Sequence, residues 1–339
     1  MAETEQFITQ HPKMLEILEL IDTIAQTQAT VLITGESGTG KSLIARMIHR
    51  QSPRRNKPFI EVSCGALPET LLESELFGHV KGAFTGATAN RAGKFAAAEG
   101  GTIFLDEISS ASPALQLKLL RVLEEQKFEP VGSNETINVD VRIIVATNRN
   151  LWEDVEANLF RRDLYYRINV ININLPPLRQ RRGDIVLLAN YFLHRYAKQY
   201  SKRILGFTDA TLAMLEAYHW PGNVRELANC IERAVLLCRG HQIDVSSLPS
   251  SVVEGAKGVS SAAKSNLGNT DTSNRASRFS AAPSGAAVAS LAETLAETEK
   301  RIIRAALAAH GGSRQATAKA LGINRCTLYK KLKKYGLLK

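Results

Sequence analysis

The stretch Gly35-Glu36-Ser37-Gly38-Thr39-Gly40-Lys41-Ser42 lies between an apolar run at residues 29–34 (ATVLIT) and a helical segment at residues 42–50 (SLIARMIHR). It matches the pattern G-x-x-x-x-G-K-[ST], in which glycines let backbone N–H groups wrap the phosphates of a nucleotide. Lys41 would neutralise the β- and γ-phosphate oxygens, and the hydroxyl of Ser42 would ligate Mg²⁺. We therefore predict a strand, a phosphate-binding loop and a helix, with all eight residues at the nucleotide.

Four more short apolar runs follow along the chain, separated by segments of helical periodicity. They are residues 59–63 (FIEVS), 102–106 (TIFLD), 141–147 (VRIIVAT) and 168–175 (INVININL). Such runs favour a parallel sheet covered by helices, so residues 1–175 are predicted to form an α/β domain. After Pro176-Pro177 the periodicity is helical without strands, which predicts a small all-helical subdomain over residues 176–250.

The overall composition is that of a globular protein. Of 339 residues, 44% are hydrophobic and 22% are charged, which suits about two domains. No apolar stretch is long enough to cross a membrane and the N-terminal segment is polar and acidic, so we expect neither membrane insertion nor secretion. The four cysteines show no paired spacing, which favours thiols in a reducing compartment and predicts a cytoplasmic protein.

The net charge of +10 is concentrated near the C-terminus. Residues 291–339 contain eleven Lys and Arg against three Glu, whereas the first 250 residues contain 28 of each sign. A basic patch of this density attracts polyanions, and nucleic acid is the obvious candidate. Residues 251–290 are mostly Ser, Ala, Gly, Thr and Asn without apolar periodicity, so we predict a flexible linker between two independently folded parts.

A second element of the nucleotide site is Gly101-Thr102-Ile103-Phe104-Leu105-Asp106-Glu107, an apolar run that ends in two acids. Asp106 would hold Mg²⁺ through water, together with Ser42, and Glu107 would orient or deprotonate the attacking water. Two acids at a strand end are weak evidence alone. Together with the loop at residues 35–42 they predict the hydrolysis of a nucleoside triphosphate.

The segment Glu75-Leu76-Phe77-Gly78-His79-Val80-Lys81 precedes the sextet Gly82-Ala83-Phe84-Thr85-Gly86-Ala87. This GAFTGA sextet closely resembles the signature loop of bacterial enhancer-binding proteins, the AAA+ activators of sigma-54 RNA polymerase. The resemblance implies that the six residues form a loop tip that moves with the nucleotide state and contacts sigma-54. Small residues around Phe84 also predict a mobile loop with one exposed aromatic ring. The alternative is a flexible hairpin whose Phe84 packs back on the domain.

The same resemblance assigns further residues and implies an AAA+ fold in which the helical subdomain is a lid. Arg161 and Arg167 stand where the family has its trans-acting arginine fingers, which complete a neighbour's site in a hexameric ring. A surface salt bridge is the alternative for either arginine. Thr147 or Asn148 stands at the family's sensor I and Arg225 at its sensor II, where each would contact bound nucleotide.

The resemblance covers residues from about 7 to 245 and then 291 to 339, with three departures. Ser42 replaces a frequent Glu, so the metal site would be more like that of ordinary P-loop enzymes. Ser63 replaces the Asn that restrains the catalytic glutamate, which puts the coupling of ligand sensing to hydrolysis in doubt. Val80 replaces a common acidic residue and removes one salt bridge near the loop.

The basic C-terminal region resembles the Fis-type helix-turn-helix domain attached to the same family. We expect an amphipathic helix at residues 293–309, a second helix capped by Ser313, and a turn at residues 322–324 before the recognition helix, within a domain spanning residues 291–339. Leu328 and Leu332 should face its core. The expected DNA contacts are Arg325, Thr327, Tyr329, Lys330, Lys331, Lys333 and Lys334. A solvated lysine-rich helix is the alternative.

Together with the nucleotide motifs, the resemblance implies an ATP-driven transcription activator that binds double-stranded DNA at upstream enhancer sites and remodels the closed sigma-54 polymerase complex. ATP and Mg²⁺ would be its cofactors and a homo-oligomer, a hexamer in the family, its active form. The alternative is a non-catalytic DNA-binding regulator that uses ATP only as an assembly signal, which Ser63 keeps open. Only about thirty residues precede the first strand, so we expect no sensory domain before the ATPase and control in trans, by a repressing partner or by abundance.

Overall fold

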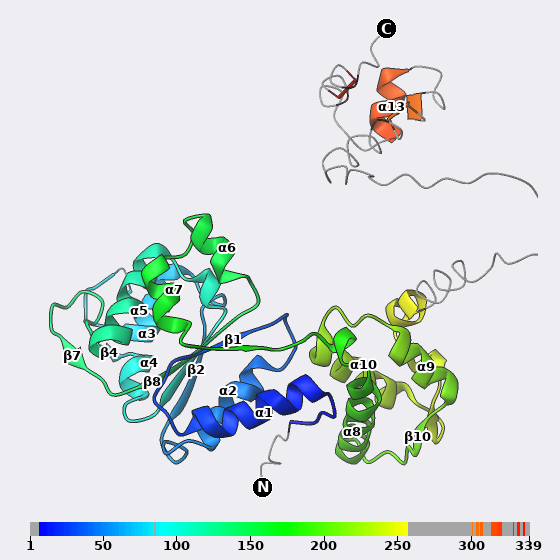
Figure 1. Ribbon diagram of the computed structural model, residues 1–339, viewed down its shortest axis with the longest axis horizontal. Helices are drawn as coiled ribbons and strands as arrows, with labels where there is room; N and C mark the ends of the chain where they lie inside the picture. Colours follow the sequence, from blue (N-terminus) through cyan, green and yellow to red (C-terminus); the bar gives the residue numbers. More distant parts are fainter. Residues whose placement is uncertain are drawn as a thin grey trace, which may run out of the picture. The chain divides into compact units, whose positions relative to one another are not determined.

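The computed structural model describes residues 7–84, 86–256 and 313–320, together with residues 300, 303–304, 306–307, 328, 331–332 and 335. The chain forms two compact units, residues 1–269 and residues 270–339. The first unit contains a sheet with helices on both faces and a helical lid (Figure 1). None of the helices in the described ranges combines the length and the apolar character that a membrane-spanning segment needs.

The centre of the first unit is a five-stranded sheet of order β2-β5-β8-β1-β9 in which every neighbouring pair is parallel. The strands are β1 (Val31–Thr34), β2 (Phe59–Ser63), β5 (Thr102–Asp106), β8 (Arg142–Thr147) and β9 (Ile171–Asn174). The α/β prediction is confirmed, and each strand lies within one of the five apolar runs. The last strand begins at Ile171 rather than 168, because Ile168 still belongs to helix α7 (Arg162–Ile168).

Two helical layers cover the sheet (Figure 1). Helices α1 (Pro12–Ala25) and α2 (Lys41–Arg50) pack on one face, and α3 (Glu69–Phe77), α5 (Pro113–Glu125), α6 (Leu151–Glu156) and α7 pack on the other. Val31 and Ile33 of β1 join the core beneath α1 and α2, whereas Leu32 joins the core on the opposite face. Since successive side chains of a strand point to opposite faces, a strand buried on both faces is apolar throughout.

Short elements complete this domain. They are α4 (Lys94–Ala97), the 3₁₀ helix η1 (Ile108–Ser110), and two antiparallel pairs, β3 (Gly78–His79) with β4 (Arg91–Ala92) and β6 (Lys127–Phe128) with β7 (Ile137–Asn138), whereas the 3₁₀ helix η2 (Leu178–Gln180) belongs to the lid core. His79 of β3 also pairs with Val131, which lies between β6 and β7. The loop that follows β3 is therefore anchored beside the loop between β6 and β7.

The lid follows Pro177 and has its own core around Trp220, which is fully buried. Its elements are α8 (Gly183–Gln199), α9 (Asp209–Ala217), α10 (Asn223–Leu237), the 3₁₀ helix η3 (Val245–Ser247) and a parallel pair of strands, β10 (Gly206–Phe207) and β11 (Gln242–Ile243). The prediction of a subdomain without strands was wrong in this respect. Strands of two residues are too short for a periodicity to reveal them.

The lid also extends beyond its predicted end at residue 250. Residues 250–256 are helical, and Val252 and Ala256 are each 1% exposed, with Val252 inside the lid core. The prediction of a linker from residue 251 was wrong for this stretch, because two apolar residues four positions apart are enough to bury one side of a short helix. The rest of the predicted linker, residues 257–290, lies outside the described residues.

In the second unit, helix α13 (Arg314–Ala320) follows Ser313. The backbone N–H of Ala316 donates to the Ser313 hydroxyl at 3.5 Å, which confirms the predicted cap. The buried cluster of this unit consists of Ile303, Ala318, Leu328 and Leu332. Leu328 and Leu332 therefore face the core, as predicted.

A buried histidine joins α2 to the sheet. His49 is 5% exposed, its Nδ1 lies 2.9 Å from Oγ1 of Thr102 in β5, and its ring packs against Phe59 of β2. Burial lowers the pKa of His49 below its usual 6.5, because an imidazolium would lose its hydration there. The folded protein therefore holds His49 neutral at pH 7.

We expect part of the stability of the fold to be lost as the pH falls below 6.5, because the unfolded chain then binds a proton at His49 that the folded chain binds only at lower pH. His49→Gln should make the free energy of unfolding less dependent on pH between about 7.5 and 5. Urea denaturation at both pH values measures this. His194→Gln, at an exposed site of α8, is the control. An unchanged pH dependence in His49→Gln would contradict the expectation.

Candidate nucleotide site and loop surface

The phosphate-binding loop joins the end of β1 to the start of α2. Gly38 has a positive φ of 77°, and a Cβ there would lie 2.3 Å from the carbonyl oxygen of Gly222 in the lid. Only glycine fits at this position, because the lid backbone closes directly over the loop. Lys41 donates from Nζ to the carbonyl oxygens of Gly35 at 2.9 Å and Glu36 at 3.1 Å. Its ammonium group therefore lies over its own loop.

The two acids at the end of β5 are held by local backbone geometry. Glu107 is left-handed, with a φ of 57°, and its N–H donates to Oδ1 of Asp106 at 2.9 Å. Ser63, at the end of neighbouring strand β2, donates from Oγ to Oε2 of Glu107 at 3.3 Å. A Cβ at Gly65 would lie 2.3 Å from the same oxygen. The short side chain of Ser63 thus reaches Glu107, and Gly65 leaves room for that carboxylate.

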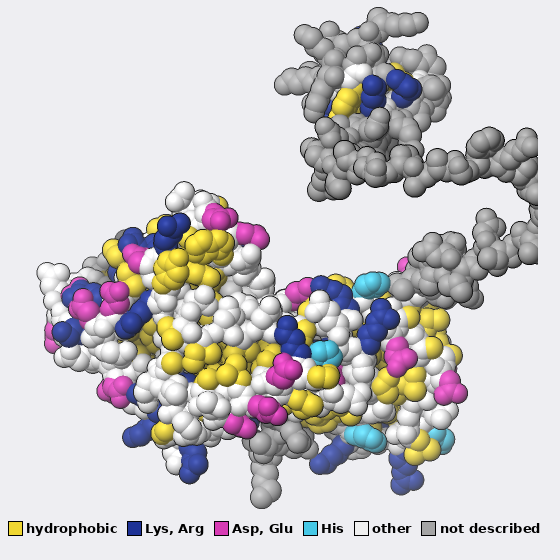
Figure 2. All heavy atoms as spheres, in the orientation of Figure 1, with side chains coloured by type: hydrophobic (Ala, Val, Ile, Leu, Met, Phe, Trp, Pro, Cys, Tyr) yellow, Lys and Arg dark blue, Asp and Glu magenta, His cyan; other side chains and the backbone are white. Residues whose placement is uncertain are grey.

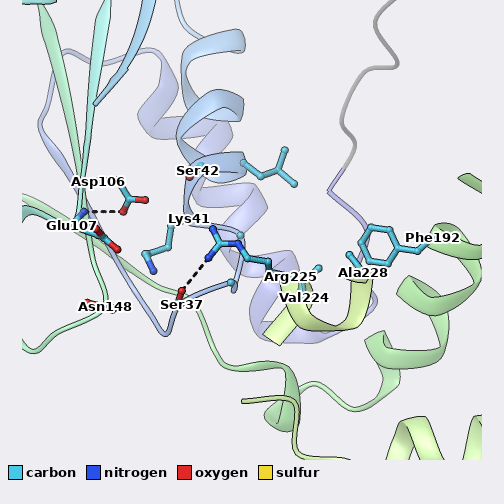
Figure 3. A pocket seen from close by; sticks show the side chains of 13 residues that line it. Ser37, Lys41, Ser42, Asp106, Glu107, Asn148, Phe192, Val224, Arg225 and Ala228 are labelled. Carbon is cyan, nitrogen blue, oxygen red and sulfur yellow. Dashed lines mark hydrogen bonds between the residues drawn. The ribbon is translucent and has the colours of Figure 1, made fainter. Parts of the chain in front are cut away.

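A cavity of about 260 Å³ brings most of the predicted nucleotide contacts together (Figure 3). Its lining residues are Ser37, Gly38, Gly40, Lys41, Ser42, Leu43, Asp106, Glu107, Asn148, Phe192, Val224, Arg225 and Ala228. The hydroxyl of Ser42 and the carboxylate of Asp106 are hard oxygen donors of the kind that Mg²⁺ prefers. The residues present therefore fit a magnesium ion beside a phosphate group.

Some predicted contacts lie elsewhere. Gly35 and Glu36 do not line this cavity, and Thr39 lines an adjoining one instead. Of the two sensor I candidates, Asn148 lines the cavity, whereas Thr147 is fully buried and donates from Oγ1 to Oγ of Ser109 at 3.2 Å. Because side chains of a tightly wrapped loop point in different directions, the pattern predicted the loop correctly but not which of its side chains enter the cavity.

Burial dominates the electrostatics of the cavity. It raises the pKa of Asp106 above its usual value, against the attraction of Lys41. It also lowers the pKa of Lys41, an effect that Asp106 partly opposes. A phosphate beside Lys41 and a divalent cation beside Asp106 would each favour the charged form of its neighbour.

Helix α10 begins directly over the phosphate-binding loop. Asn223 is fully buried, and its Nδ2 donates to the carbonyl oxygen of Ser37 at 3.0 Å while its Oδ1 accepts from the N–H of Leu178 at 2.7 Å. The N–H of Val224 donates to the carbonyl oxygen of Gly38 at 3.0 Å. Hydrogen bonds therefore connect the phosphate-binding loop to the lid, so a movement of the loop backbone would displace the start of α10.

Three arginines reinforce this contact. Arg179 donates from both terminal nitrogens to the two carboxylate oxygens of Glu36, at 2.7 and 2.6 Å, and thereby lowers the pKa of Glu36. Arg181, 1% exposed, donates to the carbonyl oxygen of Thr39 at 3.0 Å. Arg225 donates to the Ser37 hydroxyl at 3.1 Å (Figure 3). The sequence pattern predicted only Arg225, although the arginines directly after Pro177 were a signal for the other two.

A smaller, mostly apolar cavity of about 120 Å³ adjoins the first. Its walls come from the N-terminal segment, the start of α2 and helix α8. They are Phe7, Ile8, Thr39, Gly40, Leu43, Arg181, Leu188, Tyr191, Phe192, Arg195 and Val224. The N-terminal segment is fixed to the lid, because Thr9 Oγ1 and the N–H of Gln10 donate to the buried Asp184 at 2.7 and 2.8 Å. The sequence motifs did not predict that the N-terminal segment and α8 line a cavity beside the phosphate-binding loop.

The two predicted arginine fingers do not line the cavity of their own chain. Arg161 is exposed and donates from Nε and Nη2 to the two carboxylate oxygens of Asp163 at 3.0 and 2.6 Å. Arg167 donates from Nε and Nη2 to the carbonyl oxygen of Leu123 at 3.2 and 3.0 Å. Within one chain Arg161 thus forms the surface salt bridge that was its alternative. A finger role for either arginine requires a second copy of the chain.

The predicted sigma-54 contact lies between β3 and β4. Gly82 and Gly86 are exposed, and a Cβ at either would meet nothing within 4 Å, while Thr85 lies outside the described residues. Phe84 is half-buried, with its ring centroid 5.0 Å from that of His79. The prediction of an exposed aromatic ring was wrong, because the His79 ring gives Phe84 a surface to pack against. The alternative of a ring packed back on the domain describes this structure.

The same loop rests on the loop between β6 and β7. The N–H of Val80 donates to the carbonyl oxygen of Val131 at 3.2 Å. A Cβ at Gly132 would lie 2.7 Å from Cβ of Ala83 and 3.2 Å from Cγ2 of Val80. Val80 and Ala83 thus lie close against the backbone of Gly132, and the two loops are packed together.

Most of the predicted DNA contacts lie outside the described residues. These are Arg325, Thr327, Tyr329, Lys330, Lys333 and Lys334. Lys331 is described as half-buried and helical, and its carbonyl oxygen accepts from the N–H of Tyr335 at 3.0 Å. DNA contact by these seven residues stays a prediction.

Three family models match the chain in succession. The Sigma-54 interaction domain matches residues 7–174, the AAA+ ATPase lid domain matches residues 179–265, and the Fis family of bacterial regulatory proteins matches residues 294–335. The chain belongs to the sigma-54-dependent transcriptional activators. The sigma-54 activators' AAA+ ATPase domain, lid and C-terminal helix-turn-helix are thus all present, as the motifs implied.

Similar proteins cover nearly the whole chain. It is 47% identical to the transcriptional regulatory protein ZraR of Klebsiella oxytoca over 321 residues, 95% of this chain and 67% of ZraR. It is 47% identical to the regulatory protein AtoC of Escherichia coli strain K12 over 330 residues, 97% of this chain and 68% of AtoC. The crystal structure of NtrX from Brucella abortus in complex with ADP has a TM-score of 0.69 at 31% identity, covering 98% of this chain and 70% of NtrX.

We predict that Asn223→Gly weakens ATP binding about tenfold, since it removes the hydrogen bonds that the Asn223 side chain forms with Ser37 and Leu178, while glycine tolerates the positive φ of 52°. Isothermal titration calorimetry with a slowly hydrolysed ATP analogue measures the Kd. The control is Asn190→Ala, because Asn190 donates only to the carbonyl oxygen of Val186 in its own helix. An equal Kd in Asn223→Gly and the wild type would show that the lid contact does not support nucleotide binding.

Proposed function

We propose that this chain is a Mg²⁺-dependent ATPase that assembles into a hexameric ring, binds double-stranded DNA at upstream enhancer sites, and uses hydrolysis to remodel the closed sigma-54 polymerase complex in the cytoplasm. The observation that carries the proposal is the convergence of Lys41, Ser42, Asp106 and Glu107 on one cavity beneath a lid arginine, Arg225. Regulation by a separate protein stays a prediction from the sequence.

The cavity supports a hydrolytic role for each side chain. Ser42 and Asp106 would hold Mg²⁺, which when bound would neutralise charge on the β- and γ-phosphate oxygens. Lys41 would exchange its contacts with the loop carbonyls for phosphate oxygens. Glu107, kept at the cavity wall by its left-handed backbone, would orient the attacking water and accept its proton. Asn148 would fix the same water or the γ-phosphate.

The adjoining apolar cavity supports ATP as the nucleotide. It shares four lining residues with the phosphate cavity, Gly40, Leu43, Phe192 and Val224, so one ligand spans both. A planar base would lie among apolar side chains of the N-terminal segment and α8. NtrX from Brucella abortus, which is similar in fold, was solved with ADP and with ATP.

Two features support a ring. Neither Arg161 nor Arg167 lines its own cavity, so either of them would reach a γ-phosphate only in the site of a neighbouring copy. The ion pair of Arg161 with Asp163 is exposed on both sides, and such a surface pair adds little stability, so it is easily exchanged for a phosphate. A head-to-tail contact repeated around a closed ring would give every site a finger.

Glu107→Gln should retain ATP binding and lower the hydrolysis rate by about 10²- to 10⁴-fold, because it removes the general base while keeping the shape of the side chain. Phosphate release and nucleotide binding, measured on the same preparation, check both parts. The control is Glu99→Gln, at an acid outside the cavity lining. The alternative of a non-catalytic regulator predicts no turnover in the wild type, and that result would refute an ATPase.

Thr85→Ala should reduce open-complex formation on a sigma-54 promoter far more than it reduces ATP hydrolysis, since Thr85 belongs to the predicted polymerase contact and no described residue of the sextet lines the nucleotide cavity. A promoter-opening assay with permanganate footprinting, paired with an ATPase assay, separates the two. Thr88→Ala, just beyond the sextet, is the control. Normal promoter opening by Thr85→Ala would remove the loop from the mechanism.

A further inference from the structure

A single glutamine of α5 joins two segments that the proposed reaction uses. Gln116 is 1% exposed, and both polar atoms of its amide form hydrogen bonds with backbone groups. Its Nε2 donates to the carbonyl oxygens of Ala111 at 2.8 Å and Leu159 at 3.0 Å, and its Oε1 accepts from the N–H of Arg161 at 2.8 Å. This orientation of the amide is fixed, because two of the partners are acceptors and one is a donor.

The first segment continues from the hydrolytic carboxylate. Glu107 precedes η1, in which the N–H of Ser110 donates to the carbonyl oxygen of Glu107 at 2.9 Å and the N–H of Ala111 donates to that of Ile108 at 3.0 Å. Ala111 is thus one tight turn from Glu107. Its carbonyl oxygen is one of the two that Gln116 holds.

The second segment carries a proposed arginine finger. Leu159 is 59% exposed, the Phe160 side chain is buried in the core, and Arg161 is the residue before α7. Gln116 bonds this segment on both sides of Phe160. The Gln116 amide therefore fixes the position of the Arg161 backbone at the edge of the core. The guanidinium of Arg161 does not line the nucleotide cavity of its own chain.

We propose that Gln116 is a positioning residue that acts through Arg161 on the nucleotide site of the neighbouring subunit, and not on the site of its own chain. This inference rests on the proposed ring with a trans-acting Arg161. The alternative is that Gln116 acts on the nucleotide site of its own chain, through Ala111 and the turn that follows Glu107. The hydrogen bonds of Gln116 permit either route. The two routes predict different results when subunits that lack Gln116 are mixed with other variant subunits in one ring.

Gln116→Met keeps the length of the side chain and removes all three hydrogen bonds. We expect the kcat for ATP to fall about 10²-fold, the effect of misplacing a catalytic group by roughly 1 Å, with the Kd for an ATP analogue unchanged. Gln116→Glu retains an acceptor for the N–H of Arg161 and should recover part of the rate. Gln126→Met, which removes one hydrogen bond to the N–H of Val141 at the other end of α5, should hydrolyse ATP like the wild type.

Mixing full-length variants decides between the routes. Glu107→Gln and Arg161→Ala, each inactive alone, should restore hydrolysis when mixed, because some seams of the ring then join an intact Glu107 to an intact Arg161. Gln116→Met should likewise regain activity when mixed with Glu107→Gln, and should gain none when mixed with Arg161→Ala. That pattern supports the assignment, since Gln116→Met and Arg161→Ala would then both impair the arginine finger and neither could supply it to the other.

Other outcomes overturn it. Recovery of Gln116→Met with Arg161→Ala, and not with Glu107→Gln, would place its action in cis. Loss of activity in every mixture, with a lowered Tm or no incorporation into rings, would make Gln116 a residue of fold stability only. If Glu107→Gln and Arg161→Ala themselves fail to complement, the trans-acting Arg161 of the proposed function fails first, and this inference fails with it.

Discussion

The site depends on one topological constraint, that the carboxyl ends of parallel strands all lie at the same edge of a sheet. Strand β8 lies between β1 and β5, so the loop after β1, the acids after β5 and Asn148 after β8 meet although they are far apart in the sequence. The three central strands, β5, β8 and β1, are buried on both faces by α1 and α2 and by the helices α3 to α7. On the face drawn in Figure 2, charged side chains lie around apolar patches of this domain.

The lid covers this edge of the sheet. Its contacts with the rest of the chain differ in how much they stabilise the structure. The ion pair between Glu36 and Arg179 is more than a third exposed on both sides, so it stabilises by at most about 1 kcal/mol. Asn223 is fully buried, and removing it would leave the N–H of Leu178 without a partner, at a cost of about 1 to 3 kcal/mol. The same amide donates to the carbonyl oxygen of Ser37, so one buried group contacts both the start of the lid and the phosphate-binding loop. A phosphate that rearranges the loop would act on the lid through that amide.

The sequence predicted features that depend on local pattern and failed on features that depend on packing. The strands, the phosphate-binding loop and the acids Asp106 and Glu107 were recognisable, because each is a short run with its own physical reason. Asn223 and Gln116 act through backbone groups of distant segments, and no spacing in the sequence reveals such a partner. Phe84 was expected to be exposed because its neighbours are small, but the ring of His79 covers part of it. The linker prediction failed at residues 251–256, where Val252 joins the lid core and Ala256 is buried.

The central claim is that one chain contains a complete site for binding ATP and an incomplete site for hydrolysing it. The most direct test is the rate of ATP hydrolysis per protomer over a range of protein concentrations, with the mass of the particles followed by light scattering on the same samples. The account predicts a rate per protomer that is near zero for single chains and rises steeply as rings form. A rate per protomer that is the same for single chains and for rings would contradict it.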